Sequence, residues 1–192
     1  MRIYLVTDER LLLGKDLYRT VEAAVKGGVS MVQLREKESS TREFVERAIR
    51  LKEVLTPYGV PLIINDRVDV ALAADADGVH VGQSDMLYEM VKRLLPEGKI
   101  IGLSVESPEQ VLEANDYDLD YVAASPVFST TTKTNTIVEW GLDGLRWIRS
   151  VSRHPLVAIG GIHSNNVASI FKAGADSVAV ISAIVSADDP ER

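Results

Sequence analysis

Residues 156–182 read LVAIGGIHSNNVASIFKAGADSVAVIS, and the fold prediction starts from their pattern. The apolar run Leu156–Ile159 predicts a short strand. Polar residues that favour a helix start come next, and a helix is expected over Asn166–Ala173 with Gly174 at its end. A second apolar run, Ser177–Ile181, follows after two more residues. The stretch therefore predicts a strand, a helix and a further strand, in the order typical of a parallel sheet.

Similar apolar runs recur along the chain. Their starts lie about 25 residues apart on average, which is the length of one strand, one helix and two short connections. The runs are continuous and do not alternate with polar residues, which indicates strands buried on both faces of a parallel sheet. The eight runs are Ile3–Thr7, Met31–Leu34, Pro61–Asn65, Gly78–Val81, Lys99–Ser104, Asp120–Ala124, Leu156–Ile159 and Ser177–Ile181.

Eight strand-helix units favour an α/β fold of the (β/α)8 TIM barrel type, as a single domain over residues 1–192. A doubly wound open sheet has the same local pattern and stays open as the alternative. Few residues follow the last apolar run, Ser177–Ile181, so we expect the last helix of the barrel to be short or absent.

Composition and charge narrow the possible functions. The chain has 46% hydrophobic residues, no cysteine and a formal net charge of −7. The absence of cysteine excludes disulfides, thiolate zinc sites and cysteine nucleophiles. The negative charge argues against nucleic acid or an anionic membrane as a partner, so a polyanionic ligand would need a local cluster of donors or a metal ion. No run approaches ~18 apolar residues and no signal sequence is recognised, so we expect a cytoplasmic protein. The sequence leaves the oligomeric state open.

Functional side chains of such a barrel follow the ends of its strands. The second strand ends near Gln33, and the alternate residues Arg35 and Lys37 would face the same way if the extended chain continues. Two cations and an amide on one face form a possible anion site. The alternative interpretation is a loop of solvated charges.

Carboxylates follow the next two strands. Asp66 lies between Asn65 and Arg67 after the third strand, and Asp85 lies in the loop after the fourth. Two carboxylates on neighbouring loops suit Mg²⁺, which keeps several waters and takes further oxygens from a substrate phosphate. As alternatives, Asp85 could cap a helix that begins at Met86, and Asp66 could pair with Arg67.

Hydroxyls and glycines follow the later strands. Ser104 ends the fifth strand as a hydroxyl that faces the pocket. The connection over residues 125–141 contains clustered threonines followed by Lys133, and a loop of this length is often a lid, although a plain threonine-rich loop is the alternative. Gly160–Gly161 after the seventh strand and Ser182 after the eighth predict a phosphate site, because glycine lets backbone N–H groups approach phosphate oxygens.

Several common sites are missing from the sequence. There is no G-x-G-x-x-G after the first strand and no Walker A motif, which argues against the common nucleotide sites. The histidines, His80, His154 and His163, lack zinc-site spacing. His80 lies near a strand end, where a packed and hydrogen-bonded side chain is commoner than a catalyst.

These blocks together resemble the thiamine-phosphate synthase family, also called thiamine-phosphate pyrophosphorylase, over nearly the whole chain. The resemblance implies a (β/α)8 barrel and a transferase that joins 4-amino-2-methyl-5-hydroxymethylpyrimidine pyrophosphate to 4-methyl-5-(2-phosphoethyl)thiazole, giving thiamine monophosphate and pyrophosphate. The matching blocks are Gln33-x-Arg35-x-Lys37, Asn65-Asp66-Arg67, Asp77-Gly78-Val79-His80-x-Gly82-Gln83-x-Asp85, Gly102-x-Ser104, Pro126-Val127-Phe128-x-Thr130-x-Thr132-Lys133, Gly160-Gly161-Ile162 and Val180-Ile181-Ser182.

The resemblance also implies residue roles. Asp66 and Asp85 would hold Mg²⁺ as the cofactor. The contacts to the pyrimidine pyrophosphate would come from Gln33, Arg35, Lys37, Asn65, Ser104 and Lys133. The contacts to the thiazole phosphate would come from Thr130, Thr132, Gly161, Ile181 and Ser182.

Two other functions remain as alternatives. The thiazole tautomerase branch of the same superfamily binds only the thiazole phosphate, and its members tend to have a histidine where this chain has Pro126. A non-catalytic barrel that senses a phosphate ligand is the other, although such a binder has little use for paired aspartates and Mg²⁺.

Overall fold

The computed structural model describes residues 2–129 and 139–192. Its strands form one closed barrel in which each strand is parallel to the next in chain order. Strand β1 (Arg2–Val6) pairs with β8 (Ser177–Val180), with Leu5 opposite Val180, and this pairing closes the ring. The predicted (β/α)8 barrel is confirmed, and the open-sheet alternative is wrong. The other strands are β2 Val29–Leu34, β3 Leu62–Asn65, β4 Gly78–Val81, β5 Ile100–Val105, β6 Tyr121–Ala124 and β7 Leu156–Ile159.

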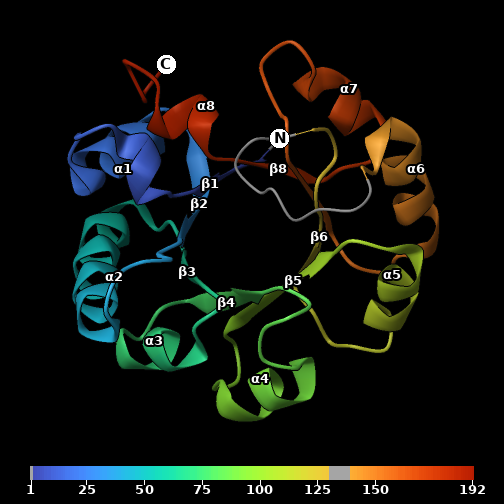
Figure 1. Cartoon of the computed structure of the whole chain (residues 1–192), viewed down its shortest axis with the longest axis horizontal. Helices are drawn as coiled ribbons and strands as arrows, with labels where there is room; N and C mark the ends of the chain where they lie inside the picture. The colour runs from blue at the N-terminus through green and yellow to red at the C-terminus, as the bar shows by residue number, and fades with distance from the viewer. Residues whose placement is uncertain (1, 130–138) are drawn as a thin grey trace.

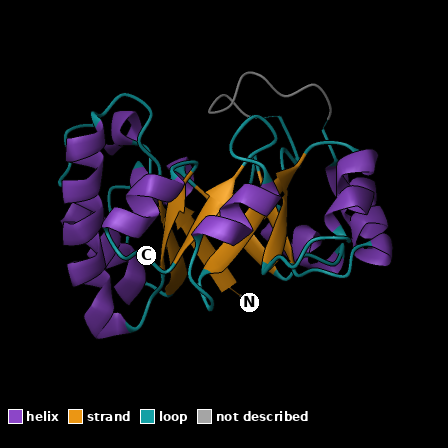
Figure 2. Cartoon of the chain, turned by 90° about the horizontal axis from the view of Figure 1, so that it is seen from below, coloured by secondary structure: helices purple, strands orange, loops and turns teal. Residues whose placement is uncertain are grey.

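Helices form a ring outside the strands, as the view down the barrel shows (Figure 1). In Figure 2 the strands lie in the middle with helices on both sides. Helix α8 covers only Ser182–Val185, which confirms the expected short last helix. Across the described residues, no helix combines the length and the apolar character that crossing a bilayer requires. The other helices are α1 Leu17–Lys26, α2 Thr41–Leu55, α3 Val68–Ala73, α4 Tyr88–Leu94, α5 Pro108–Ala114, α6 Gly141–Val151 and α7 Val167–Lys172, with short 3-10 helices η1 Glu9–Leu12 and η2 Thr56–Tyr58.

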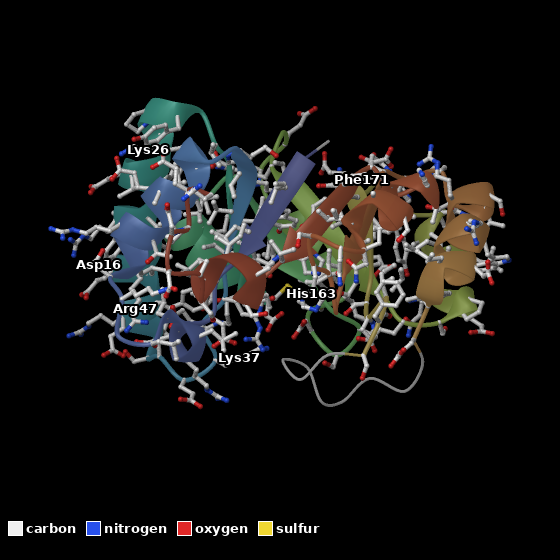
Figure 3. All side chains as sticks on the ribbon, turned by 90° about the horizontal axis from the view of Figure 1, so that it is seen from above. Asp16, Lys26, Lys37, Arg47, His163 and Phe171 are labelled. Atoms are coloured by element: carbon white, nitrogen blue, oxygen red, sulfur yellow. The ribbon has the colours of Figure 1, made fainter. Side chains whose placement is uncertain are left out.

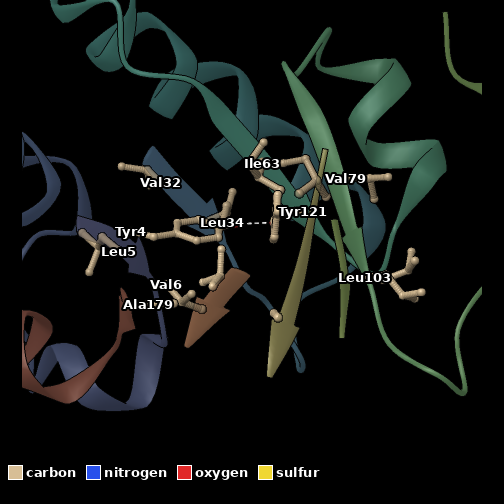
Figure 4. Packing of buried hydrophobic residues seen from close by; sticks show 14 of the residues in the cluster. Tyr4, Leu5, Val6, Val32, Leu34, Ile63, Val79, Leu103, Tyr121 and Ala179 are labelled. Carbon is tan, nitrogen blue, oxygen red and sulfur yellow. Dashed lines mark hydrogen bonds between the residues drawn. The ribbon is translucent and has the colours of Figure 1, made fainter. Parts of the chain in front are cut away.

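The strands are buried on both faces. Every residue of β3 and of β4 is buried, because inward side chains fill the barrel and outward side chains pack under the helices. Phe44 and Leu51 of α2 belong to the same buried cluster as the strand residues. Figure 4 shows part of this cluster, including Leu34 and Ile63 of neighbouring strands. Burial on both faces explains why the strands appear in the sequence as continuous apolar runs.

The parallel strands bring all their carboxyl ends to one end of the barrel, which we call the rim. Figure 3 shows Lys37, which follows β2, and His163, which follows β7, toward the same lower edge of the molecule. Lys26, which precedes β2, lies toward the upper edge. Residues that follow the strands therefore meet at the rim, although they are far apart in the sequence.

Candidate active site

The loop after β2 fixes Arg35 at the rim. Arg35 Nη1 donates a 2.7 Å hydrogen bond to Asp8 Oδ2, and the backbone N–H of Arg35 donates to Thr7 Oγ1. Only 14% of the Arg35 side chain and 13% of the Asp8 side chain are exposed. The same loop is held from outside, because Arg47 of α2 donates a 2.8 Å hydrogen bond to the buried carboxylate of Glu36. These contacts leave the guanidinium of Arg35 little freedom.

Three more charged side chains meet above β3 and β4. Lys37 Nζ lies 2.5 Å from Asp66 Oδ2. Asp66 has a φ of 64°, a left-handed conformation that aspartate adopts more readily than most residues with a side chain. Asp85 Oδ2 accepts a 2.7 Å hydrogen bond from the N–H of Gly82. Burial raises the pKa of the Asp85 carboxyl, and the neighbouring Asp66 carboxylate raises it further, against the lowering effect of the Gly82 N–H. The negative charges of the two aspartates therefore disfavour each other.

The structure decides against the two alternative interpretations of these aspartates. Helix α4 begins at Tyr88 with Leu87 as its capping residue, so Asp85 does not cap it. Arg67 Nε donates a 2.8 Å hydrogen bond to Asp69, and Asp66 pairs with Lys37. Both carboxylates thus remain at the rim between neighbouring strands.

The charges of this group, which we call the aspartate cluster, do not balance. The cluster comprises the cations Arg35 and Lys37 and the carboxylates Asp8, Asp66 and Asp85, which together leave one negative charge. Among the described residues, no group of three or more histidines, aspartates or glutamates is arranged to hold a metal ion. A hard divalent cation that keeps waters and takes further oxygens from a ligand fits this set of donors.

A small pocket lies between the aspartate cluster and the barrel interior, and we call it the mouth pocket. It has a volume of about 20 Å³, and its polar lining residues are Tyr4, Gln33, Arg35, Asn65, His80 and Ser104. Ser104 Oγ lies 2.8 Å from His80 Nε2. The predicted residues Gln33, Asn65 and Ser104 are all buried, and the structure brings them together beside Arg35.

A second cavity, of about 260 Å³, lies where β6, β7 and β8 end, and we call it the glycine pocket. Gly161 has a φ of 63°, and a Cβ atom on it would lie 2.7 Å from the Cβ of Phe128 and 2.8 Å from the carbonyl oxygen of Ser129. Only glycine fits this close approach of two loops. Ile181 and Ser182 line the same cavity. The N–H of Gly161 forms no backbone hydrogen bond with any described residue, so it can donate to a ligand.

The two pockets share a wall. Ile159, Ala179 and Ile181 line both the mouth pocket and the glycine pocket. The described lining of the glycine pocket contains no aspartate, glutamate, lysine or arginine. Its one titratable lining residue is His163, so a site with several paired charges lies beside a site with no fixed charge among its described lining residues.

The structure leaves some predicted residues undescribed and adds others. Thr130, Thr132 and Lys133 lie outside the described residues, and so does most of the expected lid. Asp8 was missed, although it follows the first strand just as Asp66 follows the third, and the same signal would have found it. The buried hydrogen bonds of His80 had no sequence signal beyond its place near a strand end.

Comparisons with known proteins agree on one family. The family model described as thiamine monophosphate synthase matches residues 3–184. The thiamine-phosphate synthase of Albidiferax ferrireducens is 52% identical over 190 residues, which cover 99% of this chain and 87% of that protein. The thiamine-phosphate synthase of Vibrio campbellii is 50% identical, with 99% and 93% covered. The solved thiamine phosphate pyrophosphorylase of Pyrococcus furiosus superposes with a TM-score of 0.90 at 41% identity, with 99% and 90% covered.

Proposed function

Since the chain belongs to the thiamine monophosphate synthase family, its activity is that of a thiamine-phosphate synthase, a transferase, and we propose how its two pockets divide the substrates. The curated relatives are thiamine-phosphate synthases, which favours this activity over the tautomerase and the non-catalytic sensor. In our proposal the pyrimidine pyrophosphate binds at the aspartate cluster and over the mouth pocket, and the thiazole phosphate occupies the glycine pocket. The single domain over residues 1–192 and the cytoplasmic location stay predictions.

The aspartate cluster binds the pyrophosphate group together with Mg²⁺. The cluster alone has one excess negative charge and would repel a polyanion, whereas a divalent ion held by Asp66 and Asp85 changes its charge to +1. Arg35 and Lys37 then contact the phosphate oxygens as charge-assisted donors. When bound, Mg²⁺ supplies charge neutralisation for the departing pyrophosphate.

The pyrimidine ring lies over the opening of the mouth pocket, whose volume of about 20 Å³ is too small to enclose it. Gln33, Asn65 and Ser104 present amide and hydroxyl groups there, and each is buried, so each favours a ligand that satisfies its hydrogen bonds. Lys133 is proposed to contact the same substrate, and its placement is a prediction from the family resemblance alone.

The glycine pocket takes the thiazole phosphate. The N–H of Gly161 and the hydroxyl of Ser182 are neutral donors that suit a monophosphate without a metal ion. Ile181, which lines both pockets, is proposed to seat the same phosphate. Thr130 and Thr132 are proposed as further donors and stay predictions.

The reaction then needs no protein nucleophile. The bond between the pyrimidine methylene carbon and the pyrophosphate oxygen breaks, and its electron pair leaves with the pyrophosphate. The thiazole nitrogen uses its lone pair to form the new carbon–nitrogen bond. Arg35 and Lys37 stabilise the negative charge that grows on the leaving group, and the anchored phosphate holds the thiazole nitrogen in line.

One observation carries this proposal: a charged pocket with a repelling aspartate pair shares a wall with an uncharged glycine-lined pocket. The test mixes both substrates with Mg²⁺ and measures thiamine monophosphate by chromatography. We expect product with Mg²⁺ and none when EDTA is added. Product at the same rate in EDTA would contradict the role of the aspartates.

A further inference from the structure

A chain of buried hydrogen bonds crosses the barrel beneath the mouth pocket, and we call it the tyrosine chain. Gln33 Nε2 donates to Tyr4 Oη at 2.7 Å, and Tyr4 Oη lies 2.8 Å from Tyr121 Oη. Tyr121 Oη lies 3.0 Å from His80 Nδ1, and His80 Nε2 lies 2.8 Å from Ser104 Oγ. Figure 4 shows Tyr4 and Tyr121 in the barrel interior, with a dashed line for a hydrogen bond beside Tyr121. Both ends of the chain are residues that line the mouth pocket.

The rings of this chain are held in place by packing. The Tyr121 ring stacks on His80 with centroids 5.6 Å apart, and it meets Tyr4 edge to face at 5.8 Å. A Cβ atom on Gly102 would lie 2.1 Å from Cζ of Tyr121, so the neighbouring strand leaves the space that this ring fills. The position of each hydroxyl is therefore set by the fold and not by a ligand.

Both tyrosines keep their hydroxyl protons. Burial raises the pKa of Tyr4 and of Tyr121 above the ordinary value for tyrosine. Each hydroxyl thus has one proton to donate, and its oxygen can accept.

The proton count gives the chain a direction. The amide nitrogen of Gln33 can only donate, so Tyr4 Oη accepts from it and donates its own proton to Tyr121. The opposite direction would leave the buried Tyr4 proton without an acceptor among the described residues, which costs free energy. Tyr121 in turn donates to His80 Nδ1.

This direction of donation decides whether Ser104, at the other end of the tyrosine chain, is a hydrogen-bond donor or an acceptor in the mouth pocket. Because the neutral His80 ring accepts a hydrogen bond at Nδ1, its single ring proton lies on Nε2. Nε2–H therefore donates to Ser104 Oγ. The proton of the Ser104 hydroxyl then has no acceptor among the described residues and is left for a group in the mouth pocket. At the near end, Gln33 uses its amide nitrogen on Tyr4 and keeps its amide oxygen as an acceptor.

We propose that the hydroxyls of Tyr4 and Tyr121 are positioning groups that make Ser104 a hydrogen-bond donor and Gln33 an acceptor in the mouth pocket. This inference rests on the proposed function, because a donor beside an acceptor matches an aminopyrimidine, whose ring nitrogen accepts and whose amino group donates. A pocket with the opposite pattern would leave buried polar groups unpaired against that ring.

The first test needs no substrate. Nitrogen-15 NMR of the ligand-free protein reports which ring nitrogen of His80 is protonated, and the His80→Gln variant assigns the signal. We expect the Nε2–H tautomer in the unaltered protein, and a loss of that preference in Tyr121→Phe. The Nδ1–H tautomer in the unaltered protein would overturn the proposal, because the chain would then run the other way.

The second test separates positioning from folding. Tyr4→Phe and Tyr121→Phe keep the rings and remove only the hydroxyls. We expect each to raise KM for the pyrimidine pyrophosphate by about tenfold, the usual scale for one lost hydrogen bond, with KM for the thiazole phosphate unchanged. The double variant should be no worse than the worse single variant, because both changes cut one chain.

A matched control is available on the outside of the barrel. Tyr88 Oη accepts a 2.9 Å hydrogen bond from the N–H of Asp118, so Tyr88→Phe makes the same chemical change away from both pockets, and both KM values should stay the same. Equal rises in both KM values for Tyr121→Phe, or none, would overturn the positioning role. If the unaltered protein fails to join the two substrates, the proposed function fails, while the NMR result still decides the direction of the chain.

Discussion

The aspartate cluster and the glycine pocket lie side by side on the rim, and in our proposal they bind anions by opposite means. The cluster holds charged side chains in pairs, such as Arg35 with Asp8, and has an excess negative charge. The glycine pocket offers the backbone of Gly161 and a hydroxyl, with no lysine or arginine in its described lining. A highly charged leaving group requires a site whose charge can be adjusted by a metal ion, whereas an anchoring monophosphate needs only fixed neutral donors.

The largest effect is expected for a substitution in the aspartate cluster. Asp85→Asn removes one of the two carboxylates proposed to hold Mg²⁺, so we expect turnover to fall by about 10²–10³-fold, with binding of the thiazole phosphate unchanged. Steady-state kinetics at saturating substrates measures the loss, and added Mg²⁺ should restore part of it. The control is Asp118→Asn, which alters a carboxylate whose side chain is 83% exposed and paired with Lys92. Normal turnover in Asp85→Asn would remove this residue from the site.

The next largest effect is expected for a substitution in the glycine pocket. Gly161→Ala places a Cβ atom 2.7 Å from Phe128, so the loop must move. We expect KM for the thiazole phosphate to rise by roughly 10- to 100-fold through left-handed strain and the clash, with pyrophosphate binding retained. Gly59→Ala is the control, because Gly59 has the same φ of 63° with nothing within 4 Å of the added atom. Equal KM values in both variants would show that the close approach at Gly161 has no role in binding.

A smaller effect is expected for a substitution that loosens the loop carrying Arg35 and Lys37, and it tests whether the two sites act separately. Arg47→Gln removes the guanidinium that pairs with Glu36, whose side chain is only 3% exposed. We expect the free energy of unfolding in urea to fall by about 1–3 kcal/mol, because the buried Glu36 carboxylate loses its charged partner and keeps only the Ser39 hydroxyl. KM should rise for the pyrimidine pyrophosphate alone. Arg10→Gln, whose partner Glu38 is 71% exposed, should change neither quantity. A parallel rise in KM for the thiazole phosphate would contradict the separation of the two sites.

The smallest effect tests the charge of the cluster. Asp8→Asn keeps an oxygen acceptor for Arg35 Nη1 but removes one negative charge, so the cluster becomes neutral without Mg²⁺. Pyrophosphate binding in EDTA should then strengthen by about two- to fivefold. Calorimetry measures this affinity, and an unchanged or weaker affinity in EDTA would show that charge does not limit binding.

The sequence was sufficient to predict the barrel, because strands that are buried on both faces appear as continuous apolar runs. Strand β4 has the predicted bounds, Gly78–Val81, since every residue in it is buried. Strand β2 begins at Val29, two residues before the predicted Met31, because the exposed Ser30 interrupts the apolar pattern. Positions after strand ends were likewise sufficient to predict that Asp66 and Asp85 lie near each other at the rim, while their role stays a prediction.

Contacts between residues far apart in the chain could not be predicted from the sequence. Tyr4 and Tyr121 are 117 residues apart, and each fits the pattern of an ordinary buried strand residue. Their hydrogen bond depends on which residues point into the closed barrel, and that follows from the register of strands that are not neighbours. The pairing of Asp66 with Lys37 was missed for the same reason, because local reasoning offered Arg67 as its partner.

Calorimetry with pyrophosphate and with the thiazole phosphate, each in Mg²⁺ and in EDTA, tests the division of labour between the two pockets most directly. We predict that pyrophosphate binds far more tightly with Mg²⁺ than in EDTA and that the thiazole phosphate binds equally well in both buffers. Binding of pyrophosphate that is indifferent to Mg²⁺, or binding of the thiazole phosphate that requires it, would contradict the account.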